Sequence, residues 1–437
     1  MGNEYAVKVK QVVTEGGTLS QRQPIFIHVK KGRFETITTD LRCLPPGVVL
    51  MDESDKTALP GLIDMHVHLM RGEPGADINL APLYLGYGVT SVRDVGSDLQ
   101  GIKQMRSRIE SGEIAGPRIF FCGPQLNGKS FRPGMCNLQT ADEARAKVKE
   151  LRNEGVHALK IYDQIGPELA RVVIEEARRS NLIVCGHLGK TTASEAIRSG
   201  ISGIEHLTSL IFELFPEGQR NPFSTNLFRM TAEIDFNGSA VRRISETVAS
   251  CGIYVDPTLV VYDRIARFTE LKSIVPSFRS VPERLSSYWL DRMGKFAGTW
   301  GYDDFEVARA SFDKLKSWLS SMQRDGVQII AGTDAPNPFI APGRALLDEI
   351  KLLTEAGLSN AAAISAATSV AASALGRADE IGAIGVGKLA DFLLMEGNPL
   401  DDISLIDRIT AVYKDGIQYD REMLVRKAEE LSNSSPV

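Results

Sequence analysis

The sequence predicts an α/β fold with parallel strands, and two observations carry this prediction. Short apolar runs that suit buried strands alternate with amphipathic stretches that suit helices, for example 141–154 and 167–180. Eight apolar runs of this kind follow one another, at 62–68, 88–94, 118–123, 157–162, 182–187, 202–207, 252–258 and 327–333. Alternation of strand and helix implies parallel pairing, and eight units fit a closed barrel better than an open sheet.

Ahead of the first barrel strand, residues 1 to about 60 predict short alternating strands separated by Gly and Pro turns, for example Ile25–Val29. The 437 residues exceed one ordinary domain but suit a barrel with a minor appended domain. The net charge is −5, with acidic and basic residues mixed along the chain. We therefore expect no nucleic-acid partner and no membrane anchor, and a small soluble molecule as substrate.

Five scattered cysteines, an odd number, argue against a disulfide framework. No run reaches the apolar length that spans a bilayer, and the first residues lack the charged and apolar regions of a secretory signal. These features predict a cytoplasmic protein.

His66 and His68 end an apolar run that is bounded by Pro60 and Gly61. Side chains in a strand repeat every two residues, so the two imidazoles would point the same way and could bind one metal ion. Taken alone, the pair is equally compatible with two histidines on a half-exposed strand. The chain contains only six histidines, however, so few remain to be incidental.

Other predicted strands also carry reactive side chains. Three of them end in His187, His206 and Asp334. Asp334 alone would also suit a turn or a helix cap. Lys160 lies in the middle of an apolar run, where an ammonium is costly unless it reaches water or a carboxylate such as Asp163.

In this order, these residues resemble the amidohydrolase superfamily, in the branch of imidazolonepropionase-like enzymes, Xaa-Pro dipeptidases and aryl-amide hydrolases. Three segments carry the resemblance: Leu59–Leu69, Gly88–Gly96 and Ile384–Leu394. The resemblance implies a (β/α)8 TIM barrel with a small composite β-sandwich domain that is built from both ends of the chain.

The implied boundaries are 61–381 for the barrel and 1–60 plus 382–437 for the β-sandwich. Two stretches, at about 208–240 and 260–303, are longer than barrel connections require and are rich in aromatic residues. They predict either a lid over the barrel mouth or a set of oligomer contacts or a second core. One insertion can serve more than one of these roles. The aromatic residues concerned are Phe212, Phe215, Phe223, Phe228, Tyr262, Phe268, Phe278, Tyr288, Trp289, Phe296 and Trp300.

The resemblance also assigns the metal ligands, which are His66, His68, Lys160, His187, His206 and Asp334. Lys160 would be carbamylated, so that its two oxygens bridge two divalent ions roughly 3.5 to 4 Å apart. Zinc is the default metal, and manganese or cobalt would also fit. His28 and His157 are not expected to bind metal.

A hydroxide shared by two such ions persists at neutral pH and can attack a carbonyl. Asp334 would accept its proton and pass it to the leaving nitrogen. Tyr262, after the seventh strand, would hydrogen-bond a substrate carboxylate or the oxyanion, or pack as a lid aromatic. Relatives often have a histidine after the third strand, and this chain has none there. Its candidate substitutes are Asn127, Lys129 and Arg132.

The sequence therefore predicts a binuclear metal-dependent hydrolase that cleaves an amide bond of an N-acyl amino acid, dipeptide or aryl amide. An ester, lactone or carbamate hydrolase would keep every ligand. A mononuclear deaminase is disfavoured, because no glutamate follows His187 closely, and a non-enzymatic scaffold would be expected to have lost ligands. Relatives commonly assemble, so we expect a homo-oligomer.

Overall fold

The computed structural model describes residues 4–14, 19–20, 24–70, 80–129, 134–220, 226–274 and 281–433. Each of the eight predicted barrel strands is present there. In chain order they are β6 (Leu62–Val67), β7 (Val89–Asp94), β8 (Arg118–Phe121), β11 (Ala158–Ile161), β12 (Ile183–Gly186), β13 (Gly203–Glu205), β14 (Tyr254–Asp256) and β15 (Gln328–Ile329). Two short strands, β9 (Gln125–Asn127) and β10 (Met135–Asn137), extend the sheet beside β11.

All the pairings between these strands are parallel, within a three-stranded sheet from β6 to β8 and a seven-stranded sheet from β10 to β15. Backbone hydrogen bonds join the two sheets on both sides. The His157 amide donates to the Phe121 carbonyl at 2.9 Å, and the Asp334 amide donates to the His66 carbonyl at 2.7 Å. The predicted barrel fold is therefore confirmed.

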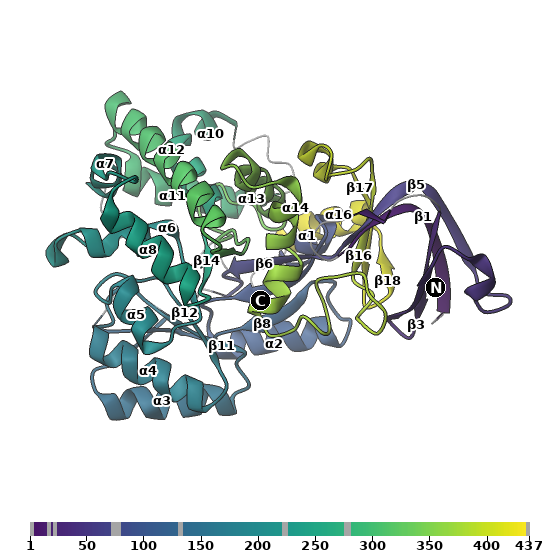
Figure 1. The fold of residues 1–437 in the computed structure, drawn as a ribbon, viewed down its shortest axis with the longest axis horizontal. Helices are drawn as coiled ribbons and strands as arrows, with labels where there is room; N and C mark the ends of the chain where they lie inside the picture. The colour runs from purple at the N-terminus through teal and green to yellow at the C-terminus, as the bar shows by residue number, and fades with distance from the viewer. Residues whose placement is uncertain are drawn as a thin grey trace.

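Helices surround the strands (Figure 1). The predicted stretches 141–154 and 167–180 form α3 (Ala141–Asn153) and α4 (Pro167–Arg179). A capping box between Thr140 and Glu143 begins α3, and Pro167 begins α4. The other helices of the barrel layer are α1 (Ala81–Gly86), α2 (Leu99–Glu110), α5 (Ala193–Ser199), α6 (Leu207–Ile211), α8 (Ser239–Ser250), α12 (Tyr302–Arg324), α13 (Arg344–Glu355), α14 (Asn360–Ala366) and α15 (Ser369–Ala374).

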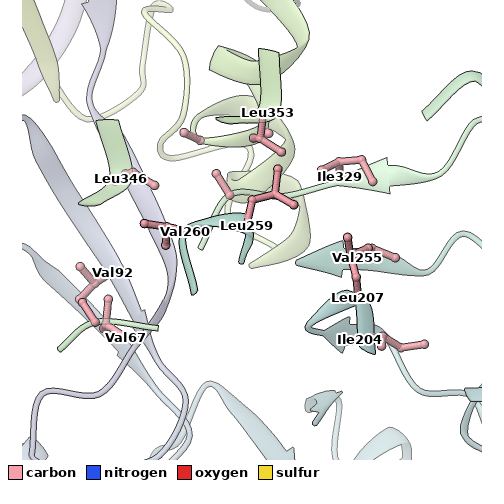
Figure 2. Packing of buried hydrophobic residues seen from close by; sticks show 14 of the residues in the cluster. Val67, Val92, Ile204, Leu207, Val255, Leu259, Val260, Ile329, Leu346 and Leu353 are labelled. Carbon is pink, nitrogen blue, oxygen red and sulfur yellow. The ribbon is translucent and has the colours of Figure 1, made fainter. Parts of the chain in front are cut away.

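The main hydrophobic core lies between the strands and these helices. Figure 2 shows Val67 and Val92 from neighbouring strands β6 and β7, together with Leu346 and Leu353 from α13. All four side chains are buried. Apolar packing of this kind fixes the strands, and thus the direction in which the side chains at their ends point.

The predicted aromatic insertions form helices at one end of the barrel, seen at the upper left of Figure 1. They are α7 (Asn226–Glu233), α9 (Leu259–Ala266), α10 (Phe268–Ile274) and α11 (Glu283–Ala297). Phe268, Trp289 and Phe339 belong to a hydrophobic cluster separate from the main core. The second core is thus present. Phe223 and Phe278 lie outside the described residues.

Both ends of the chain build one eight-stranded mixed sheet. Its strands are β1 (Glu4–Val13), β2 (Leu19–Ser20), β3 (Ile25–Lys30), β4 (Arg33–Thr38), β5 (Leu50–Pro60), β16 (Phe392–Glu396), β17 (Ile409–Lys414) and β18 (Ile417–Tyr419). Three strands separate β4 from β16, yet the rings of Phe34 and Phe392 lie 5.8 Å apart. The sheet therefore curls over its own core, which gives the predicted sandwich-like domain.

The last helix, α16 (Arg421–Asn433), packs on α1, where Arg421 donates to the Gly86 carbonyl at 2.7 Å. Single-turn 3-10 helices lie at Leu41–Cys43, Phe212–Leu214, Glu217–Gln219 and Ile403–Asp407. Among the described residues, no helix combines the length and the apolar character that crossing a membrane would require.

Candidate metal centre

The six side chains that the sequence nominated all lie at or near the carboxyl ends of barrel strands. His66 belongs to β6 and Lys160 to β11, while His187 and His206 directly follow β12 and β13. Asp334 follows β15 by five residues, and His68 comes just after β6. All six are buried. This is the end of an α/β barrel at which reactive groups usually gather.

Asp334 brings three imidazoles together. Its Oδ1 lies 3.1 Å from His68 Nε2 and 3.6 Å from His66 Nε2, and its Oδ2 lies 3.9 Å from His206 Nε2. The ligand atoms of His66, His206 and Asp334 all lie within 4.8 Å of one another, close enough to share a metal ion. The ring of His187 lies 4.4 Å from that of His206, which extends the cluster by a fourth imidazole.

Polar contacts at the other ring nitrogen hold three of these imidazoles in place. His68 Nδ1 lies 2.9 Å from the Gly96 carbonyl, and His206 Nδ1 lies 2.6 Å from Thr258 Oγ1. His66 Nδ1 lies 3.1 Å from Asp256 Oδ2. In each case Nε2 is left to face Asp334. Contacts of this type orient histidine ligands in metal proteins.

Burial lowers the pKa of His206 to about 4 and the pKa of His66 and His187 well below the usual range. These three imidazoles are therefore neutral at physiological pH and keep a lone pair for a metal ion. Soft and hard divalent cations such as zinc or manganese accept this set of nitrogen and carboxylate donors. The residues present thus fit a metal site.

The amine of Lys160 is the unusual group in this cluster. It is buried, and its Nζ makes no hydrogen bond to any described residue. Asp163, which was an alternative partner for it, instead accepts hydrogen bonds from Gln164 at 2.7 Å and Asn127 at 3.4 Å. A buried amine without a hydrogen-bond partner is unfavourable, so the position of Lys160 needs a physical explanation.

Strained backbone is found at the same end of the barrel. His206, Thr258 and Asp334 have positive φ values of 65°, 46° and 61°. Such a conformation costs of order 1 kcal/mol or more for a residue other than glycine. Two of the three are predicted ligands, and the hydroxyl of Thr258 contacts Nδ1 of His206. The backbone strain at these three residues therefore lies where side-chain direction matters.

Sequence reasoning missed a second layer of charges beneath His66. Glu205 Oε2 lies 2.7 Å from His66 Nδ1, and Arg93 Nη2 donates to Glu205 Oε1 at 2.6 Å. His66, Glu205 and Asp256 form a second group whose atoms could hold a metal ion. The sequence contained one indication of this layer, because Arg93, Glu205 and Asp256 are charged residues that each lie within an apolar strand.

Arg93 and Asp94 are adjacent in β7 but have different partners. Adjacent residues of a strand point to opposite faces, so Arg93 faces the barrel interior while Asp94 faces away. Asp94 accepts hydrogen bonds from the Leu69 amide at 2.7 Å and from Ser97 Oγ at 2.6 Å. It therefore orders the loop after His68.

A cavity of about 230 Å³ opens above the ligands, and we call it the mouth cavity. Phe228, Tyr262 and Phe296 of the predicted insertions line it, so these insertions also form walls over the barrel mouth. The lining includes the nominated ligands except Lys160, and beyond these it consists of Gly96, Ser97, Gln125, Gly134, Met135, Tyr162, Thr208, Leu227, Phe228, Val261, Tyr262, Ile265, Arg292, Met293, Phe296, Asn337, Pro338 and Ile340.

Of the candidate oxyanion donors, Tyr262 reaches the mouth cavity, whereas Asn127 and Lys129 do not line it. The Tyr262 hydroxyl lies 3.0 Å from Thr208 Oγ1 and accepts from the Thr208 amide at 3.2 Å. Burial raises the pKa of Tyr262 to about 12, so the hydroxyl keeps its proton. The Asn127 side chain is committed to Asp163, Gly128 and Gln164. Arg132 lies outside the described residues.

His28 and His157 lie away from this cluster. His28 Nε2 lies 3.0 Å from Glu4 Oε1 in the terminal sheet. His157 packs edge-on against Phe120 and Phe121, with ring centroids 5.2 and 5.3 Å away. Neither belongs to the groups of described residues that could hold a metal ion.

A parallel α/β barrel whose strand ends converge on histidines and an aspartate defines a class of metal-binding barrel proteins. The sequence model of the amidohydrolase family matches residues 57–418, which is most of the chain. The protein therefore belongs to the amidohydrolase family.

Individual relatives are more distant. Ochratoxinase of Aspergillus niger is 24% identical over 376 residues, which cover 75% of this chain and 65% of ochratoxinase. The chain thus spans less than two thirds of the length of that curated relative. A bottromycin amidohydrolase superposes with a TM-score of 0.78 at 21% identity, covering 99% of this chain and 91% of the other. A putative prolidase from Bifidobacterium longum gives 0.68 at 25% identity, covering 98% and 99%.

Proposed function

We propose that this protein is a binuclear metal-dependent hydrolase that cleaves the amide bond of a small N-acyl amino acid, dipeptide or aryl amide. One observation carries the proposal. The carboxylate of Asp334 meets three imidazoles at the barrel mouth, next to a buried lysine amine that has no hydrogen-bond partner among the described residues.

The donor set divides naturally between two ions. His66, His68 and Asp334 would hold one, and His187 and His206 would hold the other. The neutral amine of Lys160 would add carbon dioxide and release a proton to solvent, and the resulting carbamate would serve as a further anionic ligand. Zinc suits these ligands. Two divalent ions bound here would lower the pKa of a water that they share to roughly 7 and so supply a nucleophile at neutral pH.

The side chains of the chain itself then have distinct tasks. Asp334 would take up the proton of the nucleophile and deliver it to the leaving nitrogen, because its carboxylate is at the centre of the cluster. Tyr262, protonated and facing the mouth cavity, would donate a hydrogen bond to the carbonyl oxygen as negative charge develops on it. The apolar walls from the insertions would exclude bulk water.

The mouth cavity also limits the size of the substrate. Its volume of about 230 Å³ lies below the roughly 300 to 1,000 Å³ of pockets for drug-sized ligands. Compounds with one or two amino-acid units match this space. The names of two similar structures agree with this class, since one is a putative prolidase and the other a bottromycin amidohydrolase.

A hydrolysis screen tests the proposal. The zinc-loaded protein is assayed against N-acyl amino acids, dipeptides, aryl amides, carbamates and lactones, with Lys160→Ala prepared in parallel to reveal contaminating activity. We expect amides to be cleaved with the highest kcat/KM. A preference for lactones or esters would move the protein to the alternative class that uses the same ligands. A metal-replete protein that cleaves none of the compounds would contradict the proposal.

A further inference from the structure

One side chain of the mouth cavity has no role in the proposed reaction. Apart from Asp334 and the histidines, Arg292 is the single charged residue among those that line the described cavity. It lies on α11 and is half-buried. Met293 and Phe296 of the same helix line the cavity beside it. The spacing of these three residues places them on one face of the helix.

The position of α11 over the barrel is fixed by a buried tryptophan. Trp289 Nε1 donates to the Pro336 carbonyl at 2.8 Å, and its ring lies 5.9 Å from that of Phe339. Pro336 is two residues after Asp334. Because Trp289 is one turn before Arg292, this anchor sets the guanidinium relative to the loop that carries Asp334.

Arg292 itself is supported within the helix. Its Cζ lies 5.9 Å from the ring centroid of Tyr288, four residues earlier. This cation–π contact favours one orientation of a long side chain, which reduces the entropy lost when it binds a ligand.

The surroundings of Arg292 strengthen its attraction for an anion. Met293 and Phe296, which are close to Arg292 in the sequence, form part of the cavity wall. Helices α7 and α9 contribute Leu227, Phe228 and Ile265 to the same wall. An apolar wall excludes water and lowers the local dielectric constant, so a charge pair formed there is screened less than one at the surface. Guanidinium binds carboxylates through two parallel hydrogen bonds, which makes a carboxylate the best match for this position.

We propose that Arg292 is a specificity-determining residue that binds a carboxylate of the substrate. This inference rests on the proposed amide hydrolysis and narrows its substrate class to N-acyl amino acids and dipeptides, at the expense of neutral aryl amides. The scissile bond would lie at Asp334 and the histidines, and the carboxylate of the leaving amino acid would reach α11.

The first test measures binding and does not depend on turnover. Zinc-loaded wild type, Arg292→Gln and Arg292→Lys are titrated by calorimetry with 3-phenylpropanoate and with its neutral amide. Lys295→Gln is the matched control, because Lys295 lies on the same helix but is exposed and paired with Asp291 at 2.7 Å. We expect Arg292→Gln to weaken carboxylate binding about 10- to 100-fold while binding of the neutral amide is unchanged.

Arg292→Lys keeps the charge but loses the two-pronged geometry, so an intermediate loss is expected. Lys295→Gln should bind both compounds as the wild type does. If Arg292→Gln binds 3-phenylpropanoate as tightly as the wild type, the carboxylate goes elsewhere, for example to the ions, and the inference is overturned.

The second test compares hydrolysis of N-acetylphenylalanine with that of N-acetyl-2-phenylethylamine, which lacks the carboxylate. Arg292→Gln should lower kcat/KM about 10- to 100-fold for the first compound and leave the second unchanged. If both amides are cleaved and the variant keeps the wild-type preference, this inference fails while the proposed function stands. If the binding difference is found but neither amide is cleaved, the anion site stands and the proposed function fails.

Discussion

The two ends of the barrel each carry a hollow, and the larger hollow is not the better candidate site. The mouth cavity measures about 230 Å³. A hollow of about 460 Å³ lies at the opposite end, where β8 begins and where the barrel meets the terminal sheet. We call it the lower hollow. It is lined by one histidine, His157, and by the charged residues Arg106, Glu110, Arg118, Arg377, Glu380, Lys414 and Asp415.

The difference lies in how the charges are matched. In the lower hollow, Arg106 pairs with Glu110 at 2.6 Å and Arg377 with Glu380 at 3.2 Å. Lys414 pairs with Asp415 at 3.2 Å. At the mouth, Lys160 is buried without a hydrogen-bond partner among the described residues. Hydrogen-bonded ion pairs are sufficient for stability, whereas a buried amine that makes no hydrogen bond needs an additional reason to persist.

The largest effect should follow from changes at the mouth. Lys160→Ala and Asp334→Asn should each lower kcat by about 10³-fold or more, because both remove charge from the proposed metal centre. The melting temperature of Lys160→Ala should stay close to that of the wild type, since the substitution removes a buried amine that makes no hydrogen bond to a described residue. Steady-state kinetics, metal analysis and calorimetric melting measure these effects.

Bicarbonate should not restore Lys160→Ala, because no amine remains to be carbamylated. His157→Gln is the control, because His157 directly precedes β11 and lines the lower hollow. This variant should keep the wild-type kcat. A Lys160→Ala protein with normal rate and two bound ions per chain would show that the lysine does not bridge them.

The next largest effect concerns stability. Arg93→Met should lower the free energy of unfolding by about 3 to 5 kcal/mol, because it removes the guanidinium that pairs with the buried carboxylate of Glu205. Adding Glu205→Gln should recover part of that loss. Urea denaturation of the two variants and the wild type measures both changes. Equal stability of the single and the double variant would mean that Arg93 and Glu205 do not depend on each other.

A smaller effect is expected for Tyr262→Phe. If the Tyr262 hydroxyl donates a hydrogen bond to the developing oxyanion, its loss should lower kcat by about 100-fold, with KM nearly unchanged. Its contacts with Thr208 supply a structural alternative, in which loss of the hydroxyl lowers the melting temperature and leaves kcat as it was. Kinetics and melting of the same preparation separate the two roles.

The sequence predicted the barrel well because its signal is local. Each buried strand is an apolar run, and each such run was found within a few residues of its place. The last strand is shorter than predicted, since β15 covers only Gln328–Ile329. After β15 the chain leaves regular strand geometry, and Asp334 has a positive φ of 61°. Hydrophobic periodicity does not predict a strained backbone of this kind.

The site was predictable only in part. Histidines and an aspartate at strand ends are conspicuous by residue type, so the nominated ligands were found. Glu205 and Arg93 are 112 positions apart in the chain, and only the closure of the barrel makes them partners. Arg292 lies on a helical insertion that is anchored by the hydrogen bond from Trp289 to the Pro336 carbonyl. No local pattern in the sequence predicts this hydrogen bond. Long-range packing decides both cases.

The lower hollow offers a test of pH dependence. Burial lowers the pKa of His157 to about 4, while the unfolded chain has a value near 6.5. The folded state therefore binds fewer protons, so its stability is fully present above pH 6.5 and declines as the pH falls towards 4. Between pH 7 and pH 5, His157→Gln should reduce the loss of unfolding free energy by roughly 1 to 2 kcal/mol, after allowance for solvent screening. Urea denaturation at pH 7 and pH 5 measures the difference, and an unchanged slope for the variant would contradict it.

The smallest effects should come from the paired charges of the lower hollow. Arg377→Gln and Arg106→Gln each break a partly exposed ion pair, which is worth roughly 0 to 1 kcal/mol. We expect kcat within twofold of the wild type and a shift in unfolding free energy below about 1 kcal/mol. Arg292→Gln at the mouth is the informative counterpart, because it changes the same residue type in the same way. If Arg377→Gln impaired turnover as strongly as Arg292→Gln, the position of Arg292 at the mouth cavity would not explain its effect.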